Sequence, residues 1–295
     1  MRQKRKTDMK IPVALCVLMA AFVIYAEASK TQTDYAKETA AQTEVQQTEL
    51  AAETEEVQTE TETEDLLKDY PESLVAFMEK YPEATQFVLD YPKYKDVHNE
   101  IDISGEVKKG ELPLFLQWDV RWGYERYGSD FLAVTGCGPT CLSMVQCGLS
   151  GETIWNPYEV AKMAEQEGYY VNGEGSSWDL MSAGAEKLGL QVYSVTLSEE
   201  DITDTLRSGK PVICSVRAGD FTDSGHFIVL AGVNADGSIK VNDPNSRINS
   251  EKSWDIGRIL PQIKGMWAYS FGDTEEEETL YADETGEGTG EYRGY

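Results

Sequence analysis

Cys137 is the residue of this sequence best placed to act as a nucleophile. It stands between Gly136 and Gly138, two residues before Pro139. Because proline lacks an amide hydrogen and favours the first helical turn, we expect Cys137 at or just before a helix N-terminus. The free N–H groups and the dipole at such an end stabilise a thiolate. The flanking glycines would permit a tight turn and leave room for a substrate backbone.

The remaining cysteines fit structural positions. Cys141 follows Cys137 by four residues in an apolar helical pattern, and Cys214 lies inside an apolar strand pattern. We interpret these two and Cys147 as small buried hydrophobic residues. Two disulfides among the four are possible in an exported chain, but a domain of this size does not need them, and the sequence favours free thiols.

A cysteine nucleophile needs a base within hydrogen-bond reach, and the base needs a group that orients it. The chain has two histidines. His98 lies in the polar stretch 95–100 and is expected on the surface. His226 opens the apolar run 227–230, at the mouth of a strand, where a half-exposed ring can act as a general base. Taken alone, His226 would fit a structural role better, so its assignment depends on a partner.

Asp243 supplies that partner if the strand beginning at His226 forms a hairpin with the next one. Residues 234–237, Asn-Ala-Asp-Gly, are a hairpin-turn signal. A loop with an even residue count would place Asp243 opposite Ile228, on the same face as His226 and one pair along. An odd count would turn Asn242 to that face instead. We favour Asp243, whose carboxylate would hold the imidazole in one tautomer.

The elements that position these residues change in character along the chain. Helical patterns come first and β-type patterns follow, which predicts an α+β fold with an antiparallel sheet. The expected helices are residues 141–147, 157–168 and 178–188, and the expected strands are 190–195, 211–216, 227–233, 239–242 and 266–271.

Four segments together resemble the bacterial papain-like domains related to the peptidases that cut double-glycine bacteriocin leaders. They are Leu116-Gln117-Trp118-Asp119 with Trp122, Gly136-Cys137-Gly138-Pro139-Thr140 through Met144, Gly225-His226-Phe227-Ile228-Val229-Leu230, and Val241-Asn242-Asp243-Pro244. The resemblance covers about residues 112–271. It implies a papain-like fold with N-terminal helices packed on the sheet, and cysteine hydrolase chemistry.

The resemblance also implies that Gln117 lines the oxyanion hole beside the nucleophile, where a donor stabilises the developing negative oxygen. In the leader-cutting members the glutamine lies only a few residues before the cysteine. Here residues 118–136 separate Gln117 from Cys137, so a loop must return the chain to the site. No transporter segment follows the domain, so a role in leader processing is not implied.

The N-terminus predicts export. Residues 1–10 are basic and 11–26 are an unbroken apolar run, followed by Ala26-Glu27-Ala28. This is the pattern of a signal peptide at 1–28, and the run is shorter than the roughly 20 residues that span a bilayer. An uncleaved N-terminal anchor stays open as the alternative and would be the chain's contact with a membrane. We expect a secreted or cell-surface protein.

Two acidic segments carry most of the net charge of −26. Residues 31–65 have a net charge of −10 and residues 273–295 one of −8. With almost nothing to bury, the linker 29–65 and the tail 273–295 are expected to be disordered. The acidity argues against nucleic acid as a partner, because binding phosphates needs a basic surface.

The region 66–110 is expected to form a helical annex on the main domain, 111–272. Three Tyr-Pro pairs, at 70–71, 81–82 and 91–92, alternate with apolar clusters, which indicates two or three short helices. The functional alternative is an inhibitory segment that lies over the active site.

Together these features predict an exported thiol hydrolase, acting as a monomer on peptide or amide bonds. Residues 173–178 and 220–224 are expected to border the cleft. The histidines and cysteines lack the paired spacing of a zinc site, and no cofactor is expected. Two alternatives remain open: a non-catalytic binding module that uses the same groove, and a thiol acyltransferase.

Overall fold

The computed structural model of the chain describes residues 30, 67–98 and 100–272. The signal peptide expected at 1–28, the acidic tail at 273–295 and, apart from Lys30, the linker at 29–65 lie outside the described residues. The chain divides into two units, Met1–Asp69 and Tyr70–Tyr295, and the helices and strands that bear on function all belong to the second. Within the described ranges, no helix has both the length and the apolar character needed to cross a bilayer.

Short helices form the annex, as the Tyr-Pro pairs predict. Pro71 occupies the N-cap position of the first helix, while the other two prolines lie in the first turns of their helices. The apolar side chains of the annex pack against Phe131 and Ala133 of the main domain. The elements are α2 (Glu72–Lys80), the 3-10 helix η1 (Pro82–Ala84), α3 (Thr85–Leu89) and α4 (Tyr91–Tyr94).

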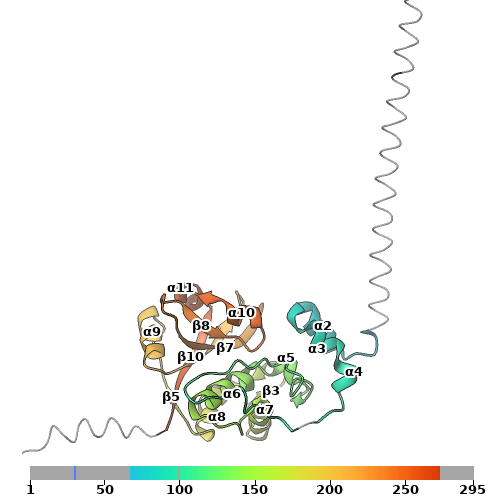
Figure 1. The fold of residues 1–295 in the computed structure, drawn as a ribbon, viewed down its shortest axis with the longest axis horizontal. Helices are drawn as coiled ribbons and strands as arrows, with labels where there is room; N and C mark the ends of the chain where they lie inside the picture. The colour runs from blue at the N-terminus through green and yellow to red at the C-terminus, as the bar shows by residue number, and fades with distance from the viewer. Residues whose placement is uncertain (1–29, 31–66, 99, 273–295) are drawn as a thin grey trace, which may run out of the picture. The chain divides into compact units, whose positions relative to one another are not determined.

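A helical layer follows, drawn in green in Figure 1. The third expected helix, 178–188, is broken in two, because Ser182 departs from helical geometry with φ −113° and ψ −89°. Two small hairpins, β1–β2 and β3–β4, join the helices. The elements are β1 (Arg126–Tyr127), β2 (Asp130–Phe131), α5 (Leu132–Thr135), α6 (Cys137–Ser150), α7 (Pro157–Gln166), β3 (Tyr170–Val171), β4 (Gly175–Ser176), the 3-10 helix η2 (Trp178–Met181) and α8 (Ala183–Lys187).

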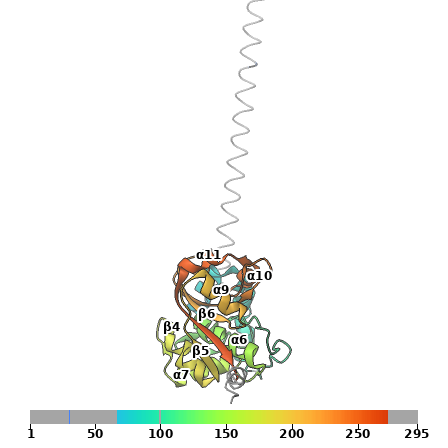
Figure 2. The same ribbon diagram turned by 90° about the vertical axis from the view of Figure 1, so that its left-hand side faces the viewer.

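The second half of the chain forms an antiparallel sheet of six strands in the order β5-β10-β6-β7-β8-β9. The α+β, papain-like fold class is thus confirmed. Figure 2 shows β10 as a long, curved strand. The strands are β5 (Leu190–Tyr193), β6 (Val212–Arg217), β7 (Gly225–Val233), β8 (Ile239–Asn242), β9 (Ser253–Trp254) and β10 (Ile263–Phe271), accompanied by α9 (Glu199–Arg207), α10 (Arg247–Glu251), α11 (Ile256–Ile259) and the 3-10 helix η3 (Leu260–Gln262).

Strand β7 divides its side chains between two cores. Phe227 and Val229 face the cluster that contains α6, while Ile228 and Leu230 face the cluster beneath α9 and α11, as expected for a strand with both faces buried. Helix α6 is buried along most of its length and packs on β7. This packing fixes the start of α6 beside the start of β7.

The β7–β8 hairpin differs from the expected geometry. Val233 pairs with Ile239, so the loop 234–238 has an odd number of residues, and the predicted even count is wrong. A register shift between Leu230 and Gly232 then pairs Val229 with Asn242. The extra residue of a bulge moves the register by one. The bulge therefore restores the pairing that an even loop would have produced.

Candidate active site

Cys137 is the first residue of α6, as the glycine and proline pattern predicts. Its side chain is partly exposed, whereas Cys141, Cys147 and Cys214 are buried. All four described cysteines are free thiols. Cys137 is therefore the one of the four that combines solvent access with the N-terminus of a 14-residue helix, where backbone N–H groups favour a thiolate.

The two glycines beside Cys137 are required for a reason other than the expected one. Neither has a positive φ, so no left-handed turn is involved. A Cβ atom on Gly136 would lie 2.4 Å from the carbonyl oxygen of Leu132, and one on Gly138 would lie 2.5 Å from Ser176 Oγ. The space that the glycines leave is thus filled by the protein's own chain, which packs the nucleophile's backbone against β4.

His226 lies between Cys137 and Asp243. Its Nε2 is 2.8 Å from Asp243 Oδ1, and both side chains are buried. The ring lines the same two clefts as Cys137 and interacts electrostatically with its thiol. Because Nε2 faces the carboxylate, Nδ1 is the ring nitrogen that remains for the sulfur. The expected contact of His226 with Asp243 is present, although the hairpin reaches it through a bulge.

The Asp243 carboxylate is held by several donors. Its Oδ1 also accepts the backbone N–H of Asn245 at 2.9 Å, and Oδ2 accepts Asn249 Nδ2 at 3.0 Å. Asn242, the alternative orienter, points elsewhere and donates to the carbonyl oxygen of Pro113 at 3.0 Å. Asn249 was not anticipated, since nothing in its sequence context indicates that α10 folds back onto Asp243.

The electrostatics of the pair favour a thiolate and an imidazolium. Burial raises the pKa of the Cys137 thiol. The hydrogen bond and charge of His226 lower this pKa, as do the backbone N–H groups of Phe227 and Gly138. The lowering effects are larger in sum, so the pKa lies below that of an ordinary thiol. Burial lowers the pKa of His226, while the charge and hydrogen bond of Asp243, and then Cys137, raise it above its ordinary value. The two protons titrate as a coupled system.

Gln117 lies near the nucleophile despite the long separation in sequence. Its Nε2 donates to the carbonyl oxygen of Ala133 at 2.6 Å, and its backbone N–H donates to that of Pro244 at 2.7 Å. The bond to Ala133 closes the loop 118–136 and returns the chain to the site. A carboxamide nitrogen carries two protons. One is engaged by Ala133, and among the described residues no acceptor is seen for the second.

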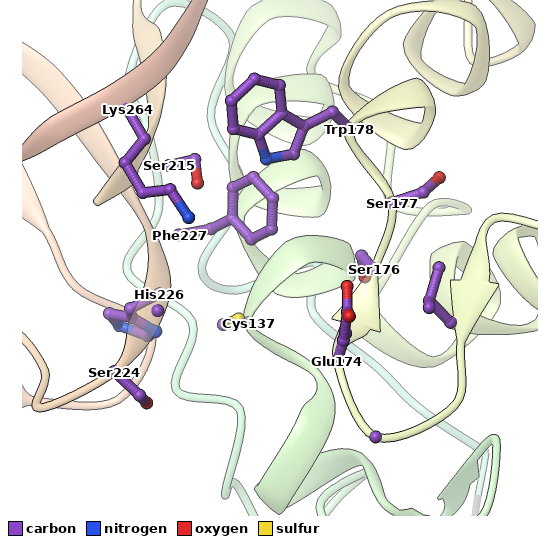
Figure 3. Close-up of a pocket in the computed structure, with 13 residues that line it drawn as sticks. Cys137, Glu174, Ser176, Ser177, Trp178, Ser215, Ser224, His226, Phe227 and Lys264 are labelled. Carbon is purple, nitrogen blue, oxygen red and sulfur yellow. The ribbon is translucent and has the colours of Figure 1, made fainter. Parts of the chain in front are cut away.

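Two clefts meet at Cys137 and His226. The first, of about 630 Å³, is lined by Cys137 and His226 and by parts of residues 171–178, 224–227 and Lys264. Figure 3 shows Cys137 between His226 on one side and Ser176, Ser177 and Trp178 on the other. Most of the expected residues 173–178 line this cleft, whereas of the expected residues 220–224 it is Ser224 that does so. Lys264 and Ser215 also line it; they were not predicted, because β6 and β10 carry no motif at these positions.

The second cleft, of about 290 Å³, lies on the annex side of the same residues. We call it the α2 cleft. Cys137, Gln117 and His226 line it from the main domain. The annex residues that line it are Ser73, Ala76, Phe77, Lys80 and Tyr81. The favoured interpretation of the annex, short helices packed on the main domain, did not include a place beside Cys137; the alternative of a segment over the active site did. His98 is exposed, as expected, and its Nδ1 lies 2.6 Å from Glu125 Oε1. Among the described residues, no group of acidic, histidine and cysteine side chains is arranged to hold a metal ion.

Comparison with known proteins supports the expected family. Residues 109–271 match the family described as Peptidase_C39 like. Among solved structures, that of a protein from Bacillus anthracis described as a C39-like peptidase is similar. It shares 15% sequence identity, with a TM-score of 0.35, and the match covers 57% of this chain and 98% of that one. No match was found among curated proteins.

Proposed function

The chain belongs to the Peptidase_C39 like family of cysteine peptidases, and from that premise we propose that it hydrolyses peptide bonds in peptides or proteins through a Cys-His-Asp triad. Cys137 is the nucleophile and His226 the acid and base. Asp243 orients His226, and Gln117 donates to the oxyanion. The observation that carries the proposal is the buried His226 ring, held between the Cys137 thiol and the Asp243 carboxylate at the meeting point of two clefts.

Acylation follows from this geometry. The Cys137 sulfur attacks the scissile carbonyl carbon, and the carbonyl oxygen takes up the negative charge. The second N–H of Gln117 and the backbone N–H of Cys137 stabilise that charge, which is the largest single contribution in such sites. The His226 imidazolium donates its Nδ1 proton to the leaving amine, and the C–N bond breaks to leave a thioester on Cys137.

Deacylation uses the same groups. Neutral His226 removes a proton from water, and the resulting hydroxide attacks the thioester carbon. The C–S bond breaks, which releases a carboxylic acid and restores the thiolate–imidazolium pair. Throughout the cycle Asp243 holds the ring in place and stabilises its charged form.

Cleavage of a pool of random synthetic peptides, followed by mass spectrometry, tests the proposal. The wild-type protein should produce cleaved peptides, and Cys137→Ala should produce none while retaining its fold. Equal cleavage by the two proteins would refute the proposal. Adding a primary amine separates hydrolysis from acyl transfer, because amide products in place of free carboxylates would indicate a transferase.

The proposal includes an extracytoplasmic location, supported by the basic and apolar sequence of residues 1–28. Cell fractionation and N-terminal sequencing of the mature protein test it. A mature protein that begins near residue 29 would indicate a cleaved signal peptide, and an intact N-terminus in the membrane fraction would indicate an anchor. An intact protein in the cytoplasmic fraction would refute the location.

A further inference from the structure

The α2 cleft has one wall that the family match does not include. The match begins at residue 109, whereas Ala76, Phe77 and Lys80 on α2 and Tyr81 beyond it line this cleft opposite Gln117 and Cys137. The space beside the nucleophile is therefore bounded on one side by residues that the family does not specify. A residue in that wall can change what enters the cleft without touching the triad.

The wall is firmly attached to the main domain. Lys80 forms an ion pair with Asp223, in the loop that leads to His226. Glu83 accepts hydrogen bonds from Ser246 Oγ and from the backbone N–H of Ile248, 3.0 Å away. The annex thus contacts both loops next to the catalytic His226 and Asp243.

Helix α2 borders the cleft without filling it. Its inner side chains Leu74 and Phe77 are buried in the annex core, while Ala76 is exposed at the cleft surface. Cys137 remains partly exposed and lines both clefts. This arrangement suits a permanent wall of a binding site better than an inhibitory cover.

The chemistry of the cleft selects its ligand. Ala76, Tyr81 and Val134 supply apolar surface. Uncharged polar side chains such as Ser73, Thr222 and Asn245 lie beside it, and Lys80, the cation in the wall, is paired with Asp223. Such a mixed lining favours an uncharged ligand group, whose apolar part is stabilised by burial against Ala76, Tyr81 and Val134. A charged side chain placed there would lose hydration and find no free opposite charge among the residues that line the cleft.

The geometry points to a specificity subsite: the α2 cleft takes an apolar side chain of the substrate, within about two residues of the scissile bond, since an extended peptide advances about 3.3 Å per residue from Cys137. This inference rests on the proposed peptidase function. It assigns to the annex the choice of substrate and leaves the chemistry to the main domain.

The test is Ala76→Phe, which fills the α2 cleft from an exposed position and should leave folding intact. The matched control is Ala183→Phe, at an exposed helical alanine of α8 that lines neither cleft. Each protein cleaves the same pool of random synthetic peptides, and mass spectrometry gives the residue preference at every position around the cut. Ala76→Val, a smaller change, provides a second variant.

The wild-type protein should prefer large apolar residues at one position near the cut. Ala76→Phe should shift that position toward glycine and alanine, with kcat/KM for the preferred peptide reduced by about tenfold or more, and Ala76→Val should shift it less. Ala183→Phe should match the wild type. An unchanged preference in Ala76→Phe, or an equal loss on all peptides, would overturn the inference. Cleavage by Cys137→Ala would instead overturn the proposed function, so the two failures are distinguishable.

Discussion

Replacing Asp243 with asparagine removes the charge behind His226 while keeping the shape of the side chain. The Oδ1 atom of the new residue can still accept from His226 Nε2 and from the backbone N–H of Asn245, as it does now. Its amide nitrogen would face Asn249, whose own amide can turn to present oxygen. The variant thus tests the charge separately from the orientation of the ring.

The expected effect is a loss of thiolate at neutral and mildly acidic pH. A hydrogen bond to a charged group is worth about 1.5–3 kcal/mol and a neutral one about 0.5–1.5 kcal/mol. The imidazolium therefore loses about 1–2 kcal/mol of stabilisation, a factor of about 5–30 in an equilibrium constant. Because the pKa of His226 is raised by Asp243 and that of Cys137 is lowered by His226, the thiolate–imidazolium pair should weaken by the same factor.

Alkylation by iodoacetamide measures this without knowledge of the substrate, because the thiolate is the reacting form. At about pH 6 an ordinary thiol is almost fully protonated, so a fast reaction reports the ion pair. Cys141, Cys147 and Cys214 interfere little. They are buried, and burial raises the pKa of each, for Cys147 to about 12. Peptide mass spectrometry assigns the modified residue.

Asp243→Asn should thus be alkylated at Cys137 about 5–30 times more slowly than the wild type at this pH. The control is Asp236→Asn, which removes an exposed carboxylate from the loop of the same hairpin and should react at the wild-type rate. Equal rates for Asp243→Asn and the wild type would show that the carboxylate does not stabilise the charged ring. The electrostatic argument would then be wrong.

Three further outcomes are expected. Gln117→Ala should lower kcat by about 10²–10³-fold, the usual cost of one oxyanion donor, and leave iodoacetamide alkylation of Cys137 nearly unchanged; an unaffected kcat would remove Gln117 from the mechanism. Lys80→Asp and Asp223→Lys should each lower the free energy of unfolding slightly, since the pair is partly exposed, and the double swap should restore it in denaturant titrations; failure to restore it would show that the pair is not coupled. The folded state raises the pKa of His226 from 6.5 to about 10, so it binds that proton more tightly than the unfolded state does. The stability advantage of the wild type over His226→Gln should be fully present below about pH 6.5 and decline as the pH rises towards 10, and a constant difference in urea unfolding across this range would contradict the assignment.

The residues of the proposed triad could be found from local sequence because each lies at the end of a regular element. Pro139 marks the start of a helix just after Cys137, and the apolar run after His226 marks the start of a strand. Such patterns depend on neighbouring residues alone. Asp243 required one more step, the pairing of two strands.

The strand-pairing argument placed Asp243 beside His226, as observed, but it assumed the wrong number of residues in the loop. The sequence of residues 234–238 does not reveal that the hairpin closes with an odd count, nor that a bulge between Leu230 and Gly232 compensates. A bulge is selected by packing on both faces of the sheet, and here β7 is buried on both. Helix α9 is a different case. It was not among the expected helices, although Ser198 caps it and Asp201 stands three residues later, a pattern typical of a helix start.

The role of the annex could not be predicted, because it depends on contacts between distant segments. The Tyr-Pro pairs and apolar clusters predict short helices, but they do not show which face of α2 lies beside Gln117. The return of the loop 118–136 depends likewise on the bond from Gln117 to Ala133. Both are products of tertiary packing.

The attachment of the annex has a consequence for the order in which the enzyme is completed. Lys80 and Asp223 are 143 positions apart, and Glu83 and Ser246 are 163 apart. Synthesis proceeds from the N-terminus, so α2 emerges long before either partner and long before His226. Contacts of such high sequence separation close late, because the loop entropy must first be overcome. The nascent chain therefore carries its nucleophile without a base or a finished cleft, and hydrolytic competence arises only when nearly the whole domain has been made.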